Sequence, residues 1–223
     1  MSLRSIITPF WALDEVTAAL PPVVMHLQER GVLAYPTETV YGFGTMVDFE
    51  SVEKLVVMKR RPPAKPFLLL VSNSTMLTRL GLSLSAQAAH LAARHWPGPL
   101  TLVLRGGEGQ LPARLRGPEG GIAVRWTPHP GLQRLITALG SPLTSTSANR
   151  PGVPPAMRAA EVVEQWSAEI NRGQLMVLDG GSLPPSPPST VVDCTGRRLR
   201  VIRPGALGAA TLRETVPDLL GDA

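Results

Sequence analysis

The chain has 223 residues, of which 43% are hydrophobic and 4% aromatic, and its formal net charge is +5. This length allows one large domain or two small ones, with a core filled mainly by aliphatic side chains. A single cysteine, Cys194, excludes internal disulfides and a cysteine-cluster zinc site, and its apolar surroundings predict a buried thiol. No apolar run approaches the ~20 residues that cross a bilayer, so we expect a cytoplasmic protein with no membrane partner.

Hydrophobic spacing predicts short helices that alternate with strands. The expected helices cover residues 14–30, 50–58, 85–95, 130–139 and 157–171. The expected strands cover residues 32–36, 67–71, 100–104, 121–126, 142–147, 175–178, 190–194 and 199–203. This alternation predicts an α/β fold in which helices cover a twisted mixed β-sheet. Pro21 and Pro22 should break or restart the first helix, because proline removes a backbone donor.

We expect one domain over residues 1–223 and no additional C-terminal domain. A proline cluster at 184–188 resembles a linker, but the chain beyond it holds only two or three expected strands, too few for a separate core. Two glycines precede this cluster. The segment 180–190 is therefore either a stiff lid on a glycine hinge or a rigid surface loop.

Lys59, Arg61 and Lys65 form a cationic cluster just beyond an expected helix end, and Pro62, Pro63 and Pro66 stiffen the backbone around it. In an extended segment residues i and i+2 point the same way, so Lys59 and Arg61 can contact one anion while Arg60 points away. This pattern predicts a triphosphate site. The alternative is that the cations only complement a helix C-terminus.

The chain contains neither of the usual glycine-rich phosphate loops, so the cationic cluster would have to hold a nucleotide. The net positive charge favours polyanionic ligands such as nucleotides or RNA. Further arginines are scattered through 105–134 and 197–203, where they indicate a generally basic surface.

Residues 143–149 combine alternating hydroxyl side chains with a terminal amide. Side chains alternate faces along a strand, so Ser145 and Ser147 share one face. A turn sequence follows and leaves Ser147 and Asn149 at the carboxyl end of the strand, where open α/β sheets bind ligands. A polar edge strand with an Asn turn is the alternative.

Thr37, Glu38 and Thr39 follow an apolar strand. Hydroxyls and a carboxylate in this position could bind an amino acid. The alternative is a turn in which the threonine hydroxyls cap backbone groups.

Six segments resemble, in order, the YrdC-type threonylcarbamoyl-adenylate synthase family. These segments are 36–42, 59–66, 96–102, 145–152, 189–193 and 203–205. The resemblance runs from about residue 32 to 207 and implies a YrdC-like fold with a basic concave site, in a short stand-alone form. It also implies that L-threonine, bicarbonate or CO2 and ATP, with Mg2+, give threonylcarbamoyl-AMP and pyrophosphate. A downstream tRNA threonylcarbamoyl transferase complex would use that product to modify the adenosine beside the anticodon.

The resemblance implies roles for individual residues as well. Lys59 and Arg61 would be catalytic. The residues implied to contact threonine are Thr37, Tyr41, Ser189 and Thr190. The residues implied to bind ATP are Lys59, Arg61, Lys65, Ser145, Ser147, Asn149 and Arg203, and no residue is expected to ligate a metal directly. Longer family members carry a histidine at the position of Leu70, so a threonine contact from there is not expected here.

Two other functions stay open. A basic module could hold double-stranded or ribosomal RNA through phosphate contacts, and weak RNA or tRNA binding would also be compatible with the enzyme. A related carbamoyl-adenylate enzyme could use another acceptor, as the carbamoyl-transfer domain of hydrogenase maturation proteins does. That domain would need acylphosphatase and zinc-finger segments, which this sequence lacks.

Overall fold

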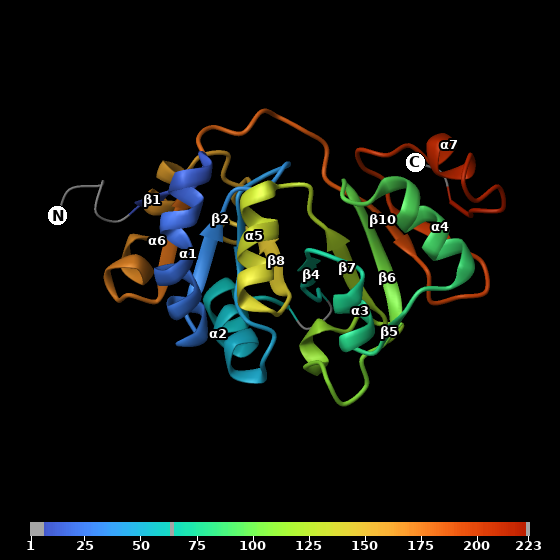
Figure 1. Ribbon diagram of the computed structural model, residues 1–223, viewed down its shortest axis with the longest axis horizontal. Helices are drawn as coiled ribbons and strands as arrows, with labels where there is room; N and C mark the ends of the chain where they lie inside the picture. The colour runs from blue at the N-terminus through green and yellow to red at the C-terminus, as the bar shows by residue number, and fades with distance from the viewer. Residues whose placement is uncertain (1–6, 63–64, 222–223) are drawn as a thin grey trace.

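The computed structural model describes residues 7–62 and 65–221 (Figure 1). Its strands are β1 (Ile7–Pro9), β2 (Val32–Tyr35), β3 (Gly42–Gly44), β4 (Leu68–Val71), β5 (Leu82–Ser83), β6 (Leu100–Gly106), β7 (Ile122–Trp126), β8 (Leu143–Ser147), β9 (Leu175–Asp179), β10 (Thr190–Asp193) and β11 (Arg200–Arg203). Its helices are α1 (Leu13–Gln28), α2 (Phe49–Lys59), α3 (Thr75–Arg79), α4 (Ala86–His95), α5 (Pro130–Leu139), α6 (Ala159–Asn171) and α7 (Ala209–Arg213), with a 3-10 turn at Ala113–Leu115. Every helix and strand expected from the sequence is present to within a few residues. The predicted mixed α/β fold is therefore confirmed.

The strands form one mixed sheet in the order β1-β9-β2-β3-β8-β4-β7-β6-β10-β11, and β5 pairs with β6 beside this path. β8 runs antiparallel to both of its neighbours, β3 and β4. Figure 1 shows α1, α2, α3 and α5 in front of the strands, while the segment between β9 and β10 arches along the top. That segment joins two strands that lie far apart in the sheet.

The first helix runs without interruption through Pro21 and Pro22, so the expectation that they break it was wrong. Both prolines are exposed, and the carbonyls that they leave unpaired belong to an exposed turn that water can reach. Along the opposite side of α1, Val16, Val23 and Leu27 are buried against the rest of the fold. Packing of this apolar stripe keeps the helix continuous.

The structure adds elements that the sequence did not predict, namely β1, β3, β5, α3 and α7. Each has between two and five residues, which is too short for hydrophobic periodicity to identify.

Cys194 is buried as predicted, and burial raises the pKa of its thiol to about 12. None of the helices in residues 7–62 and 65–221 is long and apolar enough to cross a membrane.

Candidate active site

A cavity of about 600 Å³ lies over one face of the sheet. Cross-strand pairing places Ser145 beside Leu68 and Thr101 beside Val191, so their side chains project toward the same face. The residues that line the cavity are Thr37, Thr39, Val40, Gly42, Arg61, Pro66, Leu68, Thr101, Ala123, Arg125, Ser145, Thr146, Ser147, Pro155, Ser186, Pro188, Ser189, Val191 and Arg203. Its volume is in the range of small-molecule sites.

The cavity spans the face of several strands, whereas the sequence suggested the carboxyl end of a single strand. The difference arises because β8 is antiparallel to β3 and β4, so these strands share no carboxyl edge. A larger hollow of about 850 Å³ lies elsewhere, between the ends of α1, α2 and α6, and none of the predicted site residues lines it. The smaller cavity is therefore the candidate site.

Arg61 lines this cavity with a guanidinium group that is held on several sides. Its Nη1 donates to the hydroxyl of Thr146 at 2.8 Å, and its Nε donates to the carbonyl of Lys65 at 2.7 Å. The guanidinium carbon also lies 4.7 Å from the centre of the Phe67 ring. Burial lowers the pKa of Arg61. The side chain is thus pre-positioned in the cavity wall before any ligand binds.

Lys59 occupies a different environment from the one expected. It is the last residue of α2 and is 6% exposed. Its ammonium donates to the carbonyl of Ser147 at 2.8 Å, to the side-chain oxygen of Asn149 at 3.1 Å and to the carbonyl of Asn149. All three of its N–H groups have protein acceptors, and Lys59 is not among the cavity-lining residues.

The expected extended segment does not form at this point. Arg60 is a left-handed helix cap with φ of 47°, and the amide of Lys65 donates to the carbonyl of Pro62 in a turn. The i, i+2 argument for Lys59 and Arg61 was therefore wrong, although both side chains still reach β8. Pro63, one of the prolines expected to stiffen this segment, lies outside the described residues.

Several other predicted residues organise the surrounding loops. The hydroxyl of Tyr41 donates to the carbonyl of Gly181 at 2.8 Å, and that of Thr190 donates to the carbonyl of Leu207 at 2.7 Å. The side-chain nitrogen of Asn149 donates to the backbone carbonyl of Val153 at 2.6 Å, in the loop after β8. The predicted residues outside the lining are Lys59, Lys65, Tyr41, Asn149 and Thr190. Those brought together in it are Thr37, Arg61, Ser145, Ser147, Ser189 and Arg203.

Thr37 caps the turn after β2 and also faces the cavity. Its hydroxyl donates to the carbonyl of Val40 at 2.7 Å and accepts from the amide of Thr39 at 3.1 Å, which fixes the turn after β2. Thr37 also lines the cavity. The capping contacts therefore hold the side chain where a ligand could meet it.

Arg203 and Ser189 form a connected pair on the other side of the cavity. Nη2 of Arg203 donates to the carbonyl of Ser189 at 2.7 Å and to its hydroxyl at 3.0 Å. The Ser189 hydroxyl also lies 2.9 Å from that of Thr101. Burial and the nearby Arg125 guanidinium lower the pKa of Arg203.

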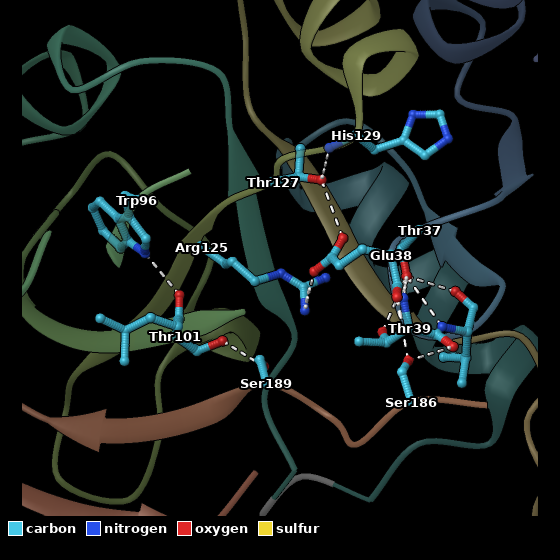
Figure 2. A network of polar contacts seen from close by, with 12 residues as sticks. Thr37, Glu38, Thr39, Trp96, Thr101, Arg125, Thr127, His129, Ser186 and Ser189 are labelled. Atoms are coloured by element: carbon cyan, nitrogen blue, oxygen red, sulfur yellow. Dashed lines mark hydrogen bonds and ion pairs between the residues drawn. The ribbon is translucent and has the colours of Figure 1, made fainter. Parts of the chain in front are cut away.

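Arg125 on β7 is a site residue that the sequence did not identify, since it was grouped with surface arginines. Its side chain is only 5% exposed, and its Nη1 lies 3.2 Å from Oε1 of Glu38. Figure 2 shows Arg125 directed toward Glu38, with Thr37 and Thr127 nearby. An arginine inside an otherwise apolar strand was the available signal, because a buried arginine requires a partner.

Comparison with known proteins places this arrangement in a family. A family model for Sua5, YciO and YrdC proteins, described as "Telomere recombination", matches residues 26–205. The chain belongs to the Sua5/YciO/YrdC family. One curated relative is the threonylcarbamoyl-AMP synthase of Chromohalobacter salexigens. It is 35% identical over 190 residues, which cover 84% of this chain and 100% of the relative.

Solved structures of the Sua5/YciO/YrdC family share the fold. P. abyssi Sua5 complexed with L-threonine is 28% identical and gives a TM-score of 0.85. The match covers 97% of this chain but 62% of that longer chain. E. coli YciO is 25% identical, with a TM-score of 0.75 and coverage of 90% and 94%.

Proposed function

We propose that this chain is a threonylcarbamoyl-AMP synthase that uses L-threonine, bicarbonate or CO2, and ATP, and releases pyrophosphate. One observation carries the proposal. Each of the six segments that resemble the synthase family contributes at least one residue to the lining of the same cavity. Segments so far apart in the chain share a cavity of this kind when they serve one ligand site.

Three arginines in the lining suit anionic substrates, and within residues 7–62 and 65–221 no Asp or Glu lines the cavity. We assign Arg61 and Arg203 to the phosphates of ATP, because guanidinium groups present planar forks to phosphate oxygens. Ser145 and Ser147 would orient the adenylate. Lys65 is exposed and directly precedes Pro66 of the lining, so its flexible ammonium can reach the phosphates from outside.

Other residues of the lining suit an amino acid. Arg125 offers a fork for the carboxylate, while Thr37 and Ser189 offer hydroxyls. Leu68, Ala123 and Val191 add apolar surface for a methyl group. Leu70, at the family's histidine position, is buried and does not line the cavity, so threonine would be held without a contact from there.

The proposed reaction requires positioning and charge neutralisation. The threonine amine and CO2 form a carbamate with loss of a proton. A carbamate oxygen then bonds to the α-phosphorus while the bond to the leaving pyrophosphate breaks. Residues such as Arg61 and Arg203 would stabilise the negative charge on the phosphates, and the rigid lining would align the reacting atoms.

Mg2+ would enter together with the triphosphate. Within residues 7–62 and 65–221, no group of three His, Cys, Asp or Glu side chains is arranged to hold a metal. The residues present fit an ion shared between phosphate oxygens and water, which is how Mg2+ commonly binds beside nucleotides. Bound Mg2+ would neutralise part of the phosphate charge.

The deciding experiment measures pyrophosphate release by the purified protein. Release should require ATP, L-threonine and bicarbonate together. Serine should have a kcat/KM lower by about 10- to 200-fold, because it lacks the methyl group that threonine would bury in the cavity. Equal turnover with unrelated amino acids would contradict the proposal. So would the absence of turnover with threonine and bicarbonate.

We further propose that the protein works in the cytoplasm as one domain and passes its product to a tRNA threonylcarbamoyl transferase complex. The continuity of its sheet supports the single domain. The Arg-rich cavity would also allow weak RNA or tRNA binding, since phosphates of any source are attracted to it.

A further inference from the structure

Glu38 and Arg125 form an ion pair at the edge of the cavity. The Arg125 side chain is 5% exposed and that of Glu38 is 20% exposed, with 3.2 Å between Nη1 and Oε1. Arg125 lines the cavity, whereas Glu38 does not. The carboxylate of Glu38 therefore contacts the guanidinium without itself lining the cavity.

Glu38 is itself held in place from two sides. The hydroxyl of Thr127, a fully buried residue, donates to Oε2 of Glu38 at 3.4 Å and accepts from the amide of His129 at 3.2 Å. The hydroxyl of Ser186 donates to the backbone carbonyl of Glu38 at 3.2 Å. These contacts, drawn in Figure 2, link the carboxylate to the start of α5 through Thr127 and the Glu38 backbone to the proline-rich segment through Ser186.

Arg125 retains an unused donor. Its Nε and the Oε1 of Glu38 are both buried and have no hydrogen-bond partner among the described residues, so the two side chains meet as an ion pair and not through a hydrogen bond. Buried guanidinium N–H groups are normally satisfied, so Arg125 has unused hydrogen-bonding capacity next to the cavity that it lines. A carboxylate can accept from Nε and one terminal nitrogen together in a bidentate arrangement.

We infer that Glu38 is a positioning residue that orients Arg125 for the carboxylate of the amino-acid substrate. This inference rests on the proposed function. Glu38 contacts Nη1 of the guanidinium, while Arg125 itself lines the cavity in which the substrate carboxylate would bind. Glu38 also neutralises one of three arginines, which leaves Arg61 and Arg203 as the net positive groups of the cavity.

The test compares Glu38→Gln and Glu38→Ala with the wild-type protein, by steady-state kinetics and by calorimetric threonine binding. We expect the Kd and KM for threonine to rise about tenfold in Glu38→Ala, while the KM for ATP changes less than about twofold. L-Threoninamide lacks the carboxylate, so its affinity should change little. Glu53→Gln is the matched control, because Glu53 pairs with Arg114 3.0 Å away and lies outside the cavity.

A double-mutant cycle adds a readout that general structural damage would not produce. If Glu38 acts through Arg125, adding Glu38→Ala to Arg125→Met should change threonine affinity less than about twofold. If Glu38→Ala does not fold, Glu38→Gln decides by the same comparisons. Wild-type threonine affinity in a folded Glu38 variant, equal losses for threonine and threoninamide, or additive effects would each overturn the inference. Failure of the wild-type protein to bind threonine would instead overturn the proposed function.

Discussion

The ammonium of Lys59 and the side-chain oxygen of Asn149 lie 3.1 Å apart, at the point where α2 meets the end of β8. The same ammonium donates to the carbonyl of Ser147 at 2.8 Å. This lysine was expected to bind phosphate. In the structure it links a helix terminus to the strand that carries Ser145 and Ser147 into the cavity.

Replacing Lys59 with methionine should therefore damage the fold as well as the reaction. The variant leaves backbone carbonyls at 147 and 149 without their charged donor, at a cost of about 2–4 kcal/mol in the free energy of unfolding. Catalytic efficiency should fall at least about tenfold as Ser147 moves. Thermal unfolding and pyrophosphate release would measure both effects, with exposed Arg60→Met as the control. Unchanged stability combined with a selective loss of ATP affinity would restore the phosphate-binding role.

Arg61→Ala should lower kcat/KM for ATP by roughly ten- to hundredfold, because a charge-assisted hydrogen bond is worth about 1.5–3 kcal/mol. Arg60→Ala should have little effect, since Arg60 is exposed and does not line the cavity. Kinetics at varied ATP and saturating threonine would separate the two variants. Similar behaviour of both would rule out a specific role for Arg61.

The pH dependence of stability should reveal the burial of Lys59. Burial and the neighbouring Arg61 lower the pKa of Lys59 from 10.5 to about 8. Between these two values the unfolded chain binds more protons than the folded chain, so this group makes the free energy of unfolding rise with pH. The difference in that free energy between wild type and Lys59→Met should thus widen from about pH 8 upward, in denaturant titrations. A constant difference for Lys59→Met would argue against burial of its charge.

The proline-rich segment should influence substrate affinity more than stability. Tyr41 anchors its first residues, and Ser186, Pro188 and Ser189 line the cavity. Glycine at the prolines 184, 185, 187 and 188 should raise substrate KM several-fold, because the segment must then be ordered on binding. The melting temperature should change little. Unchanged kinetics would make the segment a connector, and a large loss of stability would show that it packs as part of the core.

RNA binding should be weak and independent of sequence. The described lining of the cavity contains three arginines, so we expect few phosphate contacts and a shallow dependence of log Kd on log salt concentration. Filter binding from about 0.05 to 0.2 M salt would measure the slope. A sub-micromolar Kd at physiological salt together with inactive adenylation would favour an RNA-binding module instead.

The longer helices and strands could be predicted from hydrophobic periodicity, because that pattern depends only on residues a few positions apart in the sequence. The ordered segments also determined the family. The same local reasoning missed β3, whose three residues carry too little pattern, although β3 lies between β2 and β8 in the sheet. It also placed a break at Pro21, where packing of the buried face of α1 outweighs the lost hydrogen bonds.

Only the tertiary structure decided which polar side chains face the cavity. Ser189 and Thr190 are adjacent in sequence, yet one lines the cavity and the other binds the backbone of Leu207. The partner of Arg125 could not be read from the sequence, because Glu38 is 87 residues away along the chain and only the fold brings the two charges together. Sequence spacing constrains the direction of a side chain within one element. The register between elements decides what that side chain meets.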